Sequence, residues 1–469
     1  MLTFFCYIYL IIYRHNKTLG DDIMTKKSKI LSVVLILTLV IVECSLAFVW
    51  VKSGNSQNSN GQMQGGPSSS SNVSYSANSE ITDSSTVEGE SYSSSTADEN
   101  ALSVSGDVKV TLDGISAEKS GDSDGGDNTS FYGTNSAVIA KDGANITITN
   151  ATITTNATGA NGVFSYGGSA TTNNSSSDGT TVNISDSTIT TKKDNSGGIM
   201  TTGGGVTNAS NLTVNTAGTS SAAIRTDRGG GTVNVNGGTY TTTGKGSPSV
   251  YSTADVTAKN AKLVAKASEG IVIEGKNSVS IDGCTLVDSN TELNGQSTTY
   301  KNIFLYQSMS GDAADGSASF TAKNSKITTK NGDTFYITNT SAVISLENNT
   351  IVNSDSNGFF LRAKADSWGN SGSNGGDVTL TMSNQKASGD IYIDSISTLD
   401  MSLSDGSYYE GTINGENSAK SVSLKLDKTS KIKLTGDTYL TSLDDEDSSY
   451  SNIDFNGYKL YVNSKQINS

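Results

Sequence analysis

A repeat of about 23 residues is the feature of this chain that most restricts its fold, since short β-rich repeats of such lengths are typical of solenoids. Matching apolar residues begin three successive segments at Val233, Val256 and Val279. The same interval separates two further pairs, which are Phe320 and Val343, and Leu399 and Val422. In a solenoid each repeat packs only against its neighbours. The chain is therefore expected to stack its repeats rather than to form one globular core.

The composition also favours strands over helices. The chain is rich in Ser, Thr, Asn and Gly, has 2 Pro, and is 34% apolar but only 17% charged, which suits short strands joined by tight turns. Its formal net charge is -14. Such an acidic surface argues against a nucleic-acid partner, because phosphate binding depends on clustered Lys and Arg.

Each repeat resolves into three short segments with strand character. The first alternates apolar and polar residues, as at Ile146 and Ile148, and the second follows a tight turn. The third is short, as in GVFSY and GIVIE. Alternation with a period of two directs one set of side chains inward and leaves the Thr, Ser, Lys and Asn set outside.

The turn between the first and second strands provides a sharper test of this repeat. Three residues before the apolar centre of each second strand stand Asn150, Asp186, Ala209, Gly237, Asn260, Gly283, Asn324 and Asn348. All but Ala209 are Gly, Asn or Asp, the residue types that tolerate a left-handed backbone. We therefore expect the same bend in every repeat and an irregular repeat around Ala209.

These three-strand repeats and their Asn- or Gly-containing bend resemble the right-handed parallel β-helix proteins of the pectin-lyase-like superfold. The resemblance extends from Val108 to Val462. It implies an all-β fold, a right-handed parallel β-helix solenoid of about twelve three-strand rungs. The segment that ends at Val462 is expected to form the terminal rung or a cap.

The N-terminal region has the pattern of an export signal. Residues 1–23 are interpreted as an upstream extension, with Met24 as the better start. Residues 24–52 begin with a cluster of three Lys, followed by an apolar run and a small-residue site at Ser45 and Ala47, as in a cleavable signal peptide. The apolar stretch Ile30–Val51 is also long enough to remain as a membrane anchor helix, which requires about 20 residues. Both outcomes place the rest of the chain outside the cell, either anchored at the surface or secreted.

Residues 53–104 are predicted to be a disordered linker, because their Ser, Gly, Asn and Gln cannot offset chain entropy by burial. Residues 105–469 are assigned to the β-helix and its C-terminal cap. A Ser-rich stalk followed by a β-helix resembles the adhesin-like and carbohydrate-binding surface proteins of Gram-positive bacteria. The resemblance implies a non-catalytic cell-surface protein with a polysaccharide or a host or cell-surface glycan as its partner.

Long inserts interrupt the period and are the expected places for function, because repeat proteins often bind through loops on one face. Three inserts follow a third strand and share one corner of the helix, at Gly167–Thr181, Ser308–Ala318 and Lys364–Asp377. A fourth, Glu118–Thr134, lies at a different corner.

Two groups of residues near the shared corner are candidate carbohydrate ligands. Arg225, Asp227 and Arg228 form the first group. The second group is Arg362, Lys364, Asp366 and Trp368. For both groups the alternative is a solvated ion-pair surface, which is favoured over a lyase centre. Trp368 could stack on a sugar ring or could pin its own loop.

A calcium-dependent polysaccharide lyase, or another pectin-active enzyme, is the alternative function. The resemblance implies an Arg or Lys base beside acidic calcium ligands, or clustered Asp for hydrolysis. Neither group of residues matches a clustered-Asp signature, and the only histidine is His15. Cys284 has no His near it and is predicted to pack.

The acidic loop GDSDGGDN is the candidate calcium site. Its ligands would be Asp122, Asp124 and Asp127, whose short spacing with Gly can wrap a cation. The loop lacks the order of an EF-hand, so a solvated acidic loop is the alternative.

Overall fold

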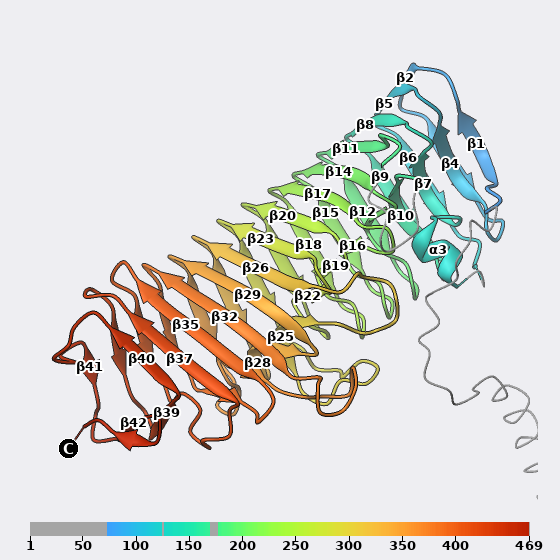
Figure 1. Ribbon diagram of the computed structural model, residues 1–469. Coiled ribbons are helices and arrows are strands. Elements are labelled where there is room, and N and C mark those ends of the chain that lie inside the picture. The colour runs from blue at the N-terminus through green and yellow to red at the C-terminus, as the bar shows by residue number, and fades with distance from the viewer. Residues whose placement is uncertain (1–72, 124–125, 169–176, 469) are drawn as a thin grey trace, which may run out of the picture. The chain divides into compact units, whose positions relative to one another are not determined.

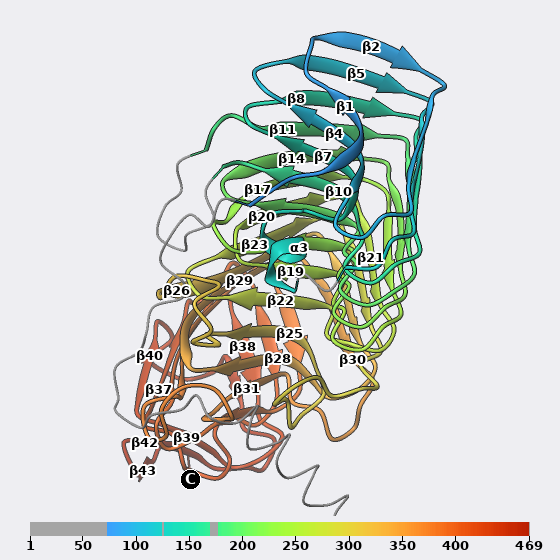
Figure 2. The same ribbon diagram turned by 90° about the vertical axis from the view of Figure 1, so that its right-hand side faces the viewer.

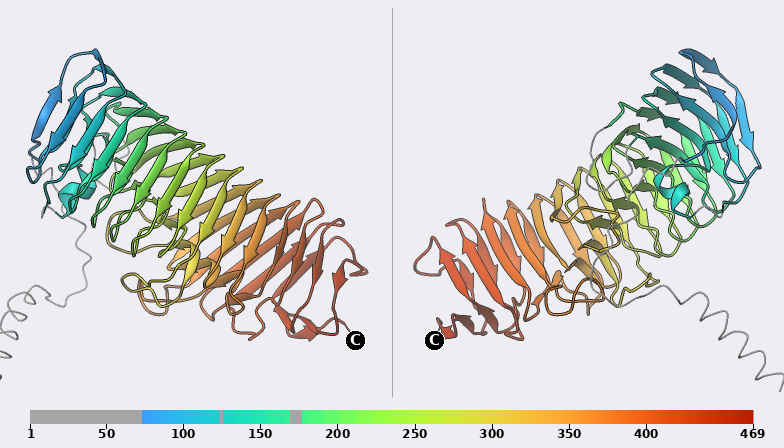
Figure 3. Two further views of the ribbon diagram at one scale, coloured as in Figure 1. Left: turned by 180° about the vertical axis from the view of Figure 1, so that it is seen from behind. Right: turned by 45° about the vertical axis from the view of Figure 1, so that its right-hand side comes forward.

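The computed structural model describes residues 73–123, 126–168 and 177–468. Within these residues the chain is a parallel β-helix, in which strands of three long sheets recur in turn along the sequence. We name them sheets A, B and C. Figures 1 and 3 show the strands stacked in chain order from the N-terminal to the C-terminal end, and Figure 2 shows the connecting bends stacked above one another.

Sheet A has twelve parallel strands. They are β1 (Ala77–Ile81), β4 (Asn100–Ser105), β7 (Ser136–Lys141), β10 (Asn161–Tyr166), β13 (Ile199–Thr202), β16 (Ile224–Thr226), β19 (Val250–Ser252), β22 (Ile271–Glu274), β25 (Lys301–Tyr306), β28 (Asp333–Thr338), β31 (Leu361–Ala363) and β34 (Ile391–Ile393).

Sheet B has fourteen parallel strands. They are β2 (Ser85–Glu88), β5 (Lys109–Asp113), β8 (Asn145–Thr149), β11 (Thr181–Ser185), β14 (Gly205–Ser210), β17 (Gly231–Asn236), β20 (Asp255–Lys259), β23 (Ser278–Asp282), β26 (Ser317–Lys323), β29 (Thr340–Glu347), β32 (Gly376–Ser383), β35 (Thr398–Ser404), β37 (Ser421–Leu426) and β40 (Ser442–Asp445).

Sheet C has ten parallel strands. They are β3 (Ser91–Ser94), β6 (Ser116–Lys119), β9 (Thr152–Thr155), β12 (Thr188–Thr191), β15 (Thr213–Thr216), β18 (Thr239–Thr242), β21 (Lys262–Ala265), β24 (Thr285–Asp288), β27 (Lys326–Thr329) and β30 (Thr350–Asn353).

Two smaller sheets complete the C-terminal end. The first comprises β33 (Lys386–Ser388), β36 (Tyr408–Glu410), β38 (Lys431–Lys433) and β41 (Ile453–Asp454). The second comprises β39 (Thr438–Leu440), β42 (Leu460–Val462) and β43 (Lys465–Gln466). The pair β42 and β43 is antiparallel, so the described chain ends its parallel stack in a short hairpin.

The predicted repeat sets the register of the sheets. Val233, Val256 and Val279 lie opposite one another on neighbouring strands of sheet B, and their side chains are buried in one apolar core. Leu399 and Val422 are paired in the same way. Stacking identical inward positions explains why an alternating pattern recurs at a fixed interval.

One predicted pair is wrong by a single residue. Phe320 pairs with Ile344, whereas Val343 pairs with Ser319 and is 38% exposed. The rung that starts at Phe320 is therefore one residue longer than the rung that starts at Val256, whose partner in the next rung is Val279. A slip of one residue turns a strand side chain to the opposite face, so Val343 points outward.

The bend between sheets B and C has the predicted left-handed conformation. Positive φ angles occur at Asn150 (55°), Asp186 (50°), Gly237 (72°), Asn260 (53°), Gly283 (63°), Asn324 (49°) and Asn348 (52°). The repeat around Ala209 is regular, contrary to the sequence-based expectation. Asn211 makes its bend at φ 50°, and Val214 is the residue in register with Ile189 and Tyr240.

The residue that follows the bend supports it from inside. The backbone N–H of Cys284 donates to Ser325 Oγ at 3.1 Å, and that of Ser325 donates to Asn349 Oδ1 at 2.9 Å. Cys284 is buried, which confirms its packing role, and its Sγ lies 3.5 Å from the Ala261 N–H. These side chains satisfy backbone donors that the tight bend would otherwise leave buried without partners.

The structure corrects the linker boundary. Residues 77–105 form β1 to β4, the first strands of the solenoid, although their composition predicts a disordered linker. Ile81, Val87 and Tyr92 are only partly buried and pack on the core from its end. An end rung covers one side of a core and needs few apolar residues, so its sequence is Ser-rich.

The N-terminal predictions lie outside the described residues. These are the extension 1–23, the export signal 24–52 and linker residues 53–72. Across residues 73–123, 126–168 and 177–468, none of the helices has the length and apolarity needed to cross a membrane.

Candidate functional site

The inserts lie at two corners of the β-helix. Three connect a strand of sheet A to the next strand of sheet B, namely 167–180, 307–316 and 364–375, and residues 169–176 of the first lie outside the described part. Residues 120–135, which include helix α3 (Asp127–Phe131), connect sheet C to sheet A. Residues 289–300 make a second insert at that corner, which the repeat pattern did not reveal. Inserts from both corners contact the outer face of sheet A.

The outer face of sheet A carries large side chains instead of the small polar residues expected on a solvated strand. The register places Arg225 beside Tyr251, and Tyr336 beside Phe304 and Arg362. Val272, Phe304 and Tyr336 form a buried cluster, with Tyr251, Tyr306 and Trp368 packed against it. The inserts therefore convert this face into a second, smaller core.

The first predicted group is engaged in ion pairs. Arg225 Nη2 lies 2.9 Å from Asp227 Oδ2, and its guanidinium also donates to the Ser220 carbonyl at 3.0 Å. Arg228 instead donates to Asp312 Oδ1 at 2.7 Å and lies 4.0 Å from the centre of the Phe131 ring. The expected solvated surface is absent from this group, because Asp227 is buried and both Arg residues are only partly exposed.

Burial also changes the acidity of this group. It raises the pKa of Asp227 to about 6, although the neighbouring Arg225 acts in the opposite direction. Enzymes often use a carboxyl group whose pKa is raised towards neutral pH, but the same shift of the pKa occurs in structural ion pairs.

The second predicted group does not form one site. Arg362 Nε donates to Asp333 Oδ2 at 2.6 Å, and its guanidinium lies 4.2 Å from the Phe359 ring centre. Asp366 accepts hydrogen bonds from the Tyr336 hydroxyl and from Thr298 Oγ1. Lys364 lies in the same insert and acts electrostatically on Asp366.

Trp368 pins its insert to sheet A. Its ring centre lies 5.2 Å from that of Phe304 and 5.4 Å from that of Tyr306. The indole is half-buried, so much of its surface is already covered by protein. Of the two roles expected for Trp368, the structure shows the packing contact.

Two charged residues that the sequence did not single out lie at the centre of this face. Lys301 is fully buried, with its Nζ 4.5 Å from the Phe304 ring centre and 3.8 Å from Glu269 Oε1. Glu274 Oε2 accepts hydrogen bonds from Tyr251 at 2.5 Å and Tyr306 at 3.1 Å. Burial raises the pKa of Glu274 and lowers that of Lys301. The sequence did contain a signal for both residues, because a charged residue stands at one end of an apolar third strand. Glu274 ends GIVIE, and Lys301 begins KNIFLY.

A pocket of about 220 Å³ opens beside these residues. Arg225, Tyr251 and Tyr306 line it together with Asn294 and Pro248. Asp227 and Glu274 lie behind this lining and are almost fully buried. The face thus combines an open pocket with two carboxyl groups of raised pKa.

The predicted calcium ligands are only partly within the described residues. Asp122 Oδ1 accepts the backbone N–H of Thr158 at 2.7 Å. Asp124 lies outside the described residues, and so does the side chain of Asp127. In the described part of the chain no group of three or more His, Cys, Asp or Glu side chains could hold a metal ion. On sheet A, Asp227 and Asp333 are bound by Arg, which does not leave an open set of oxygen ligands.

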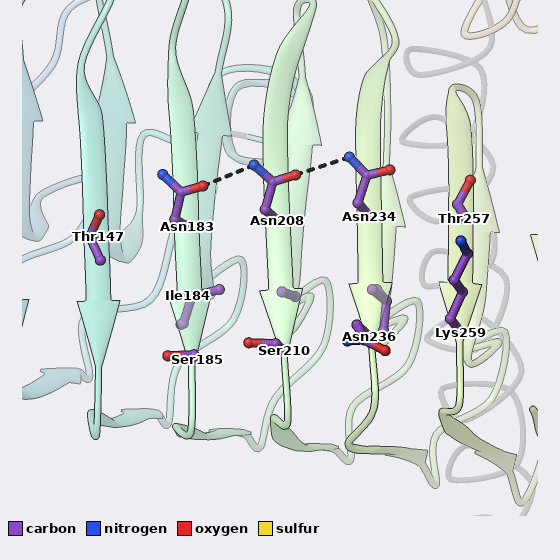
Figure 4. Close-up of a pocket in the computed structure, with 12 residues that line it drawn as sticks. Thr147, Asn183, Ile184, Ser185, Asn208, Ser210, Asn234, Asn236, Thr257 and Lys259 are labelled. Atoms are coloured by element: carbon purple, nitrogen blue, oxygen red, sulfur yellow. Dashed lines mark hydrogen bonds between the residues drawn. The ribbon is translucent and has the colours of Figure 1, made fainter.

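The outer face of sheet B has a different character. A groove of about 580 Å³ crosses it, lined among others by Thr147, Asn183, Asn208, Asn234, Thr257 and Lys259. Figure 4 shows the three Asn side chains in one file on neighbouring strands. Asn208 Nδ2 donates to Asn183 Oδ1, and Asn234 Nδ2 donates to Asn208 Oδ1, both at 2.9 Å.

Asn208 and Asn234 retain hydrogen-bonding capacity beyond the ladder, whereas Asn183 Nδ2 also donates to Asn145 Oδ1 at 3.2 Å and to the Ile146 carbonyl at 3.3 Å. Each amide has two N–H donors and a carbonyl with two lone pairs, and each link of the ladder uses one of each. Asn208 is half-buried and Asn234 is exposed. The ladder fixes the orientation of the amides before any ligand arrives, which lowers the entropy lost on binding.

Comparisons with protein-family models, curated proteins and solved structures gave no match.

Proposed function

We propose that this protein is an exported, non-catalytic cell-surface protein that binds carbohydrate. The open groove on sheet B supports this proposal, because oriented amide and hydroxyl groups are complementary to the hydroxyls of a sugar. The proposal includes an N-terminal signal or anchor that places the β-helix at the surface of a Gram-positive type of cell or releases it.

The binding surface proposed is the face of sheet B rather than the insert-bearing corner. At the corner, Arg225, Arg228 and Arg362 are each bound to a carboxylate. A ligand would have to break these pairs, and breaking a buried pair by removing one partner costs about 3 to 5 kcal/mol. In the groove, a sugar hydroxyl would compete only with water.

Binding is tested by affinity electrophoresis and a glycan array with the purified β-helix. A triple variant, Asn183→Ala, Asn208→Ala and Asn234→Ala, is expected to lose retention. The matched control changes Thr321, Ser345 and Thr381 to Ala, which lie in the same file of sheet B outside the groove. Equal loss in both variants, or binding to no glycan, would contradict the proposal.

Polysaccharide cleavage on sheet A is the second candidate function. The observation that favours it is the pocket beside Arg225, with Asp227 and Glu274 behind its lining. A lyase would release unsaturated uronate products, which absorb in the ultraviolet. Release of such products by the wild-type protein, with or without added calcium, and its loss in Arg225→Ala would establish this function.

A further inference from the structure

Four consecutive rungs of the β-helix have neutral strands on two adjacent sheets. On sheet B these strands are β8, β11, β14 and β17, with the sequences NITIT, TVNIS, GVTNAS and GTVNVN. On sheet C they are β9, β12, β15 and β18, with the sequences TITT, TITT, TVNT and TYTT. None of the eight contains Asp, Glu, Lys or Arg. We call the outer surface of these strands the neutral belt.

Charged strands border the neutral belt on both sides. The preceding rung has KVTLD and SAEK, and the following rung has DVTAK and KLVA. Because 17% of the whole chain is charged, a stretch with the combined length of the eight strands would ordinarily contain several charged residues. In the bends that join the paired strands, Asp186 is the one charged residue, and it accepts a hydrogen bond from Asn211 at 3.3 Å.

The groove coincides with the belt. Its Asn ladder lies on β11, β14 and β17, and Thr147 of β8 lines one end. Lys259 of β20 lines the other end, where charge returns. From β8 to β20 the lining crosses four strand spacings, about 19 Å along the axis of the stack.

The lack of charge indicates what the groove can hold. Apart from Lys259 at one end, an anionic polymer would find no cation along the groove, and it would approach a chain with a net charge of -14. An uncharged sugar chain needs only donors and acceptors, and it removes no charged group of the belt from water, which would be costly. The file of amides and hydroxyls also runs from strand to strand, along the axis of the helix.

We infer that the ligand of this groove is an uncharged, extended polysaccharide chain that lies along the helix axis over the neutral belt. This inference rests on the proposed carbohydrate binding and specifies its ligand class. It separates neutral glucans, mannans and xylans from polyuronates, sulfated glycans and other anionic surface polymers.

Affinity electrophoresis tests this inference by measuring how far polymers in the gel retard the β-helix. The neutral polymers are β-1,3- and β-1,4-glucans, galactomannan and arabinoxylan, and the anionic polymers are polygalacturonate and alginate. We expect retardation by at least one neutral polymer, none by the anionic ones, and no change between low and high NaCl. Retardation by anionic polymers alone would overturn the neutral class while leaving carbohydrate binding in place. Retardation by no polymer would overturn both.

A charge placed in the belt locates the site. Asn208→Glu is expected to weaken binding of the neutral polymer about tenfold, because it removes ladder hydrogen bonds and adds a charge that must be desolvated. Ser345→Glu is the matched control, since Ser345 lies in the same file beyond the groove and next to Glu347. It should change affinity less than about twofold. Equal effects of the two variants, with unchanged circular dichroism, would contradict the assignment.

Discussion

The outer faces of sheets A and B come from the same kind of alternating strand, yet they carry opposite chemistry. On sheet A, Arg225, Tyr336 and Arg362 stand outward and are covered by inserts. On sheet B, one row of outward residues is aligned from strand to strand between Thr86 and Ser402, and it consists of Thr, Asn and Ser only. The groove that crosses this row is open. On sheet A, charged groups are paired and shielded by loops, as at Arg225 and Arg362. On sheet B, charged side chains lie nearer the strand ends, as in the exposed pair Lys323 and Glu347, and the aligned row lacks them.

This difference suggests that the large inserts serve the fold as well as any ligand. A charged or aromatic side chain on an exposed strand would gain little, whereas the inserts place partners around it. Lys301, for example, lies under aromatic rings and beside Glu269. The irregular parts of the repeat are therefore not the only places to seek binding.

The largest expected effect tests whether the sheet A face stabilises the fold. Asp333 is buried, is bound to Arg362 and accepts the backbone N–H of Phe359 at 2.8 Å. Asp333→Ala leaves that guanidinium without its partner, so we expect a loss of about 3 to 5 kcal/mol in the free energy of unfolding. Urea denaturation measures it. A loss below about 1 kcal/mol would assign the pair to the solvated surface type.

The second prediction concerns pH. Burial raises the folded pKa of Asp227 from its ordinary 3.8 to about 6. The stability that its protonated form contributes is fully present below pH 3.8 and is lost as the pH rises through about 6. Compared with the wild type, Asp227→Asn should remove a decline of about 3 kcal/mol across this window. The free energy of unfolding of both proteins is measured as a function of pH. If the two curves stay parallel across this window, the pKa of Asp227 is not raised and the prediction is wrong.

The third prediction concerns the bend between sheets B and C. Asn324 has a φ of 49°, so Asn324→Ala should cost about 1 kcal/mol through backbone strain. Asn324→Gly should stay within about 0.5 kcal/mol of the wild type, since Gly adopts this conformation freely. The two variants are compared by thermal unfolding. Equal losses would assign the effect to the exposed side-chain hydrogen bonds of Asn324.

The smallest expected effect tests whether glycan binds at the groove of sheet B or at the outer face of sheet A. Trp368 packs on Phe304 and Tyr306 of sheet A, away from the proposed groove. Trp368→Ala should therefore change the affinity for a neutral glycan less than about twofold, measured by affinity electrophoresis. A loss comparable with that of Asn208→Glu would move the binding site to the insert-bearing corner.

The sequence by itself determined the solenoid. Inward residues such as Val233, Val256 and Val279 must stack to be buried, and the bend needs residues such as Asn150 or Gly283 that tolerate positive φ. Both requirements are local or strictly periodic, so they can be read along the chain. Where these requirements are weak, prediction fails. The Ser-rich first strands have the composition of a linker. In the Ala209 repeat, the pattern points to the apolar Leu212, three residues after Ala209, as the centre of the second strand, but the register places Val214 there.

Only the tertiary structure decided which side chains meet. Arg362 and Asp333 lie on neighbouring strands of sheet A and are 29 residues apart. Arg228 follows β16, whereas Asp312 lies in the insert after β25, three strands further along sheet A, so these two residues are 84 apart. No single period relates such pairs, so the Arg residues looked like free ligands in the sequence. The neutral belt also depends on stacking, because its eight short strands become one continuous surface only when the register aligns them.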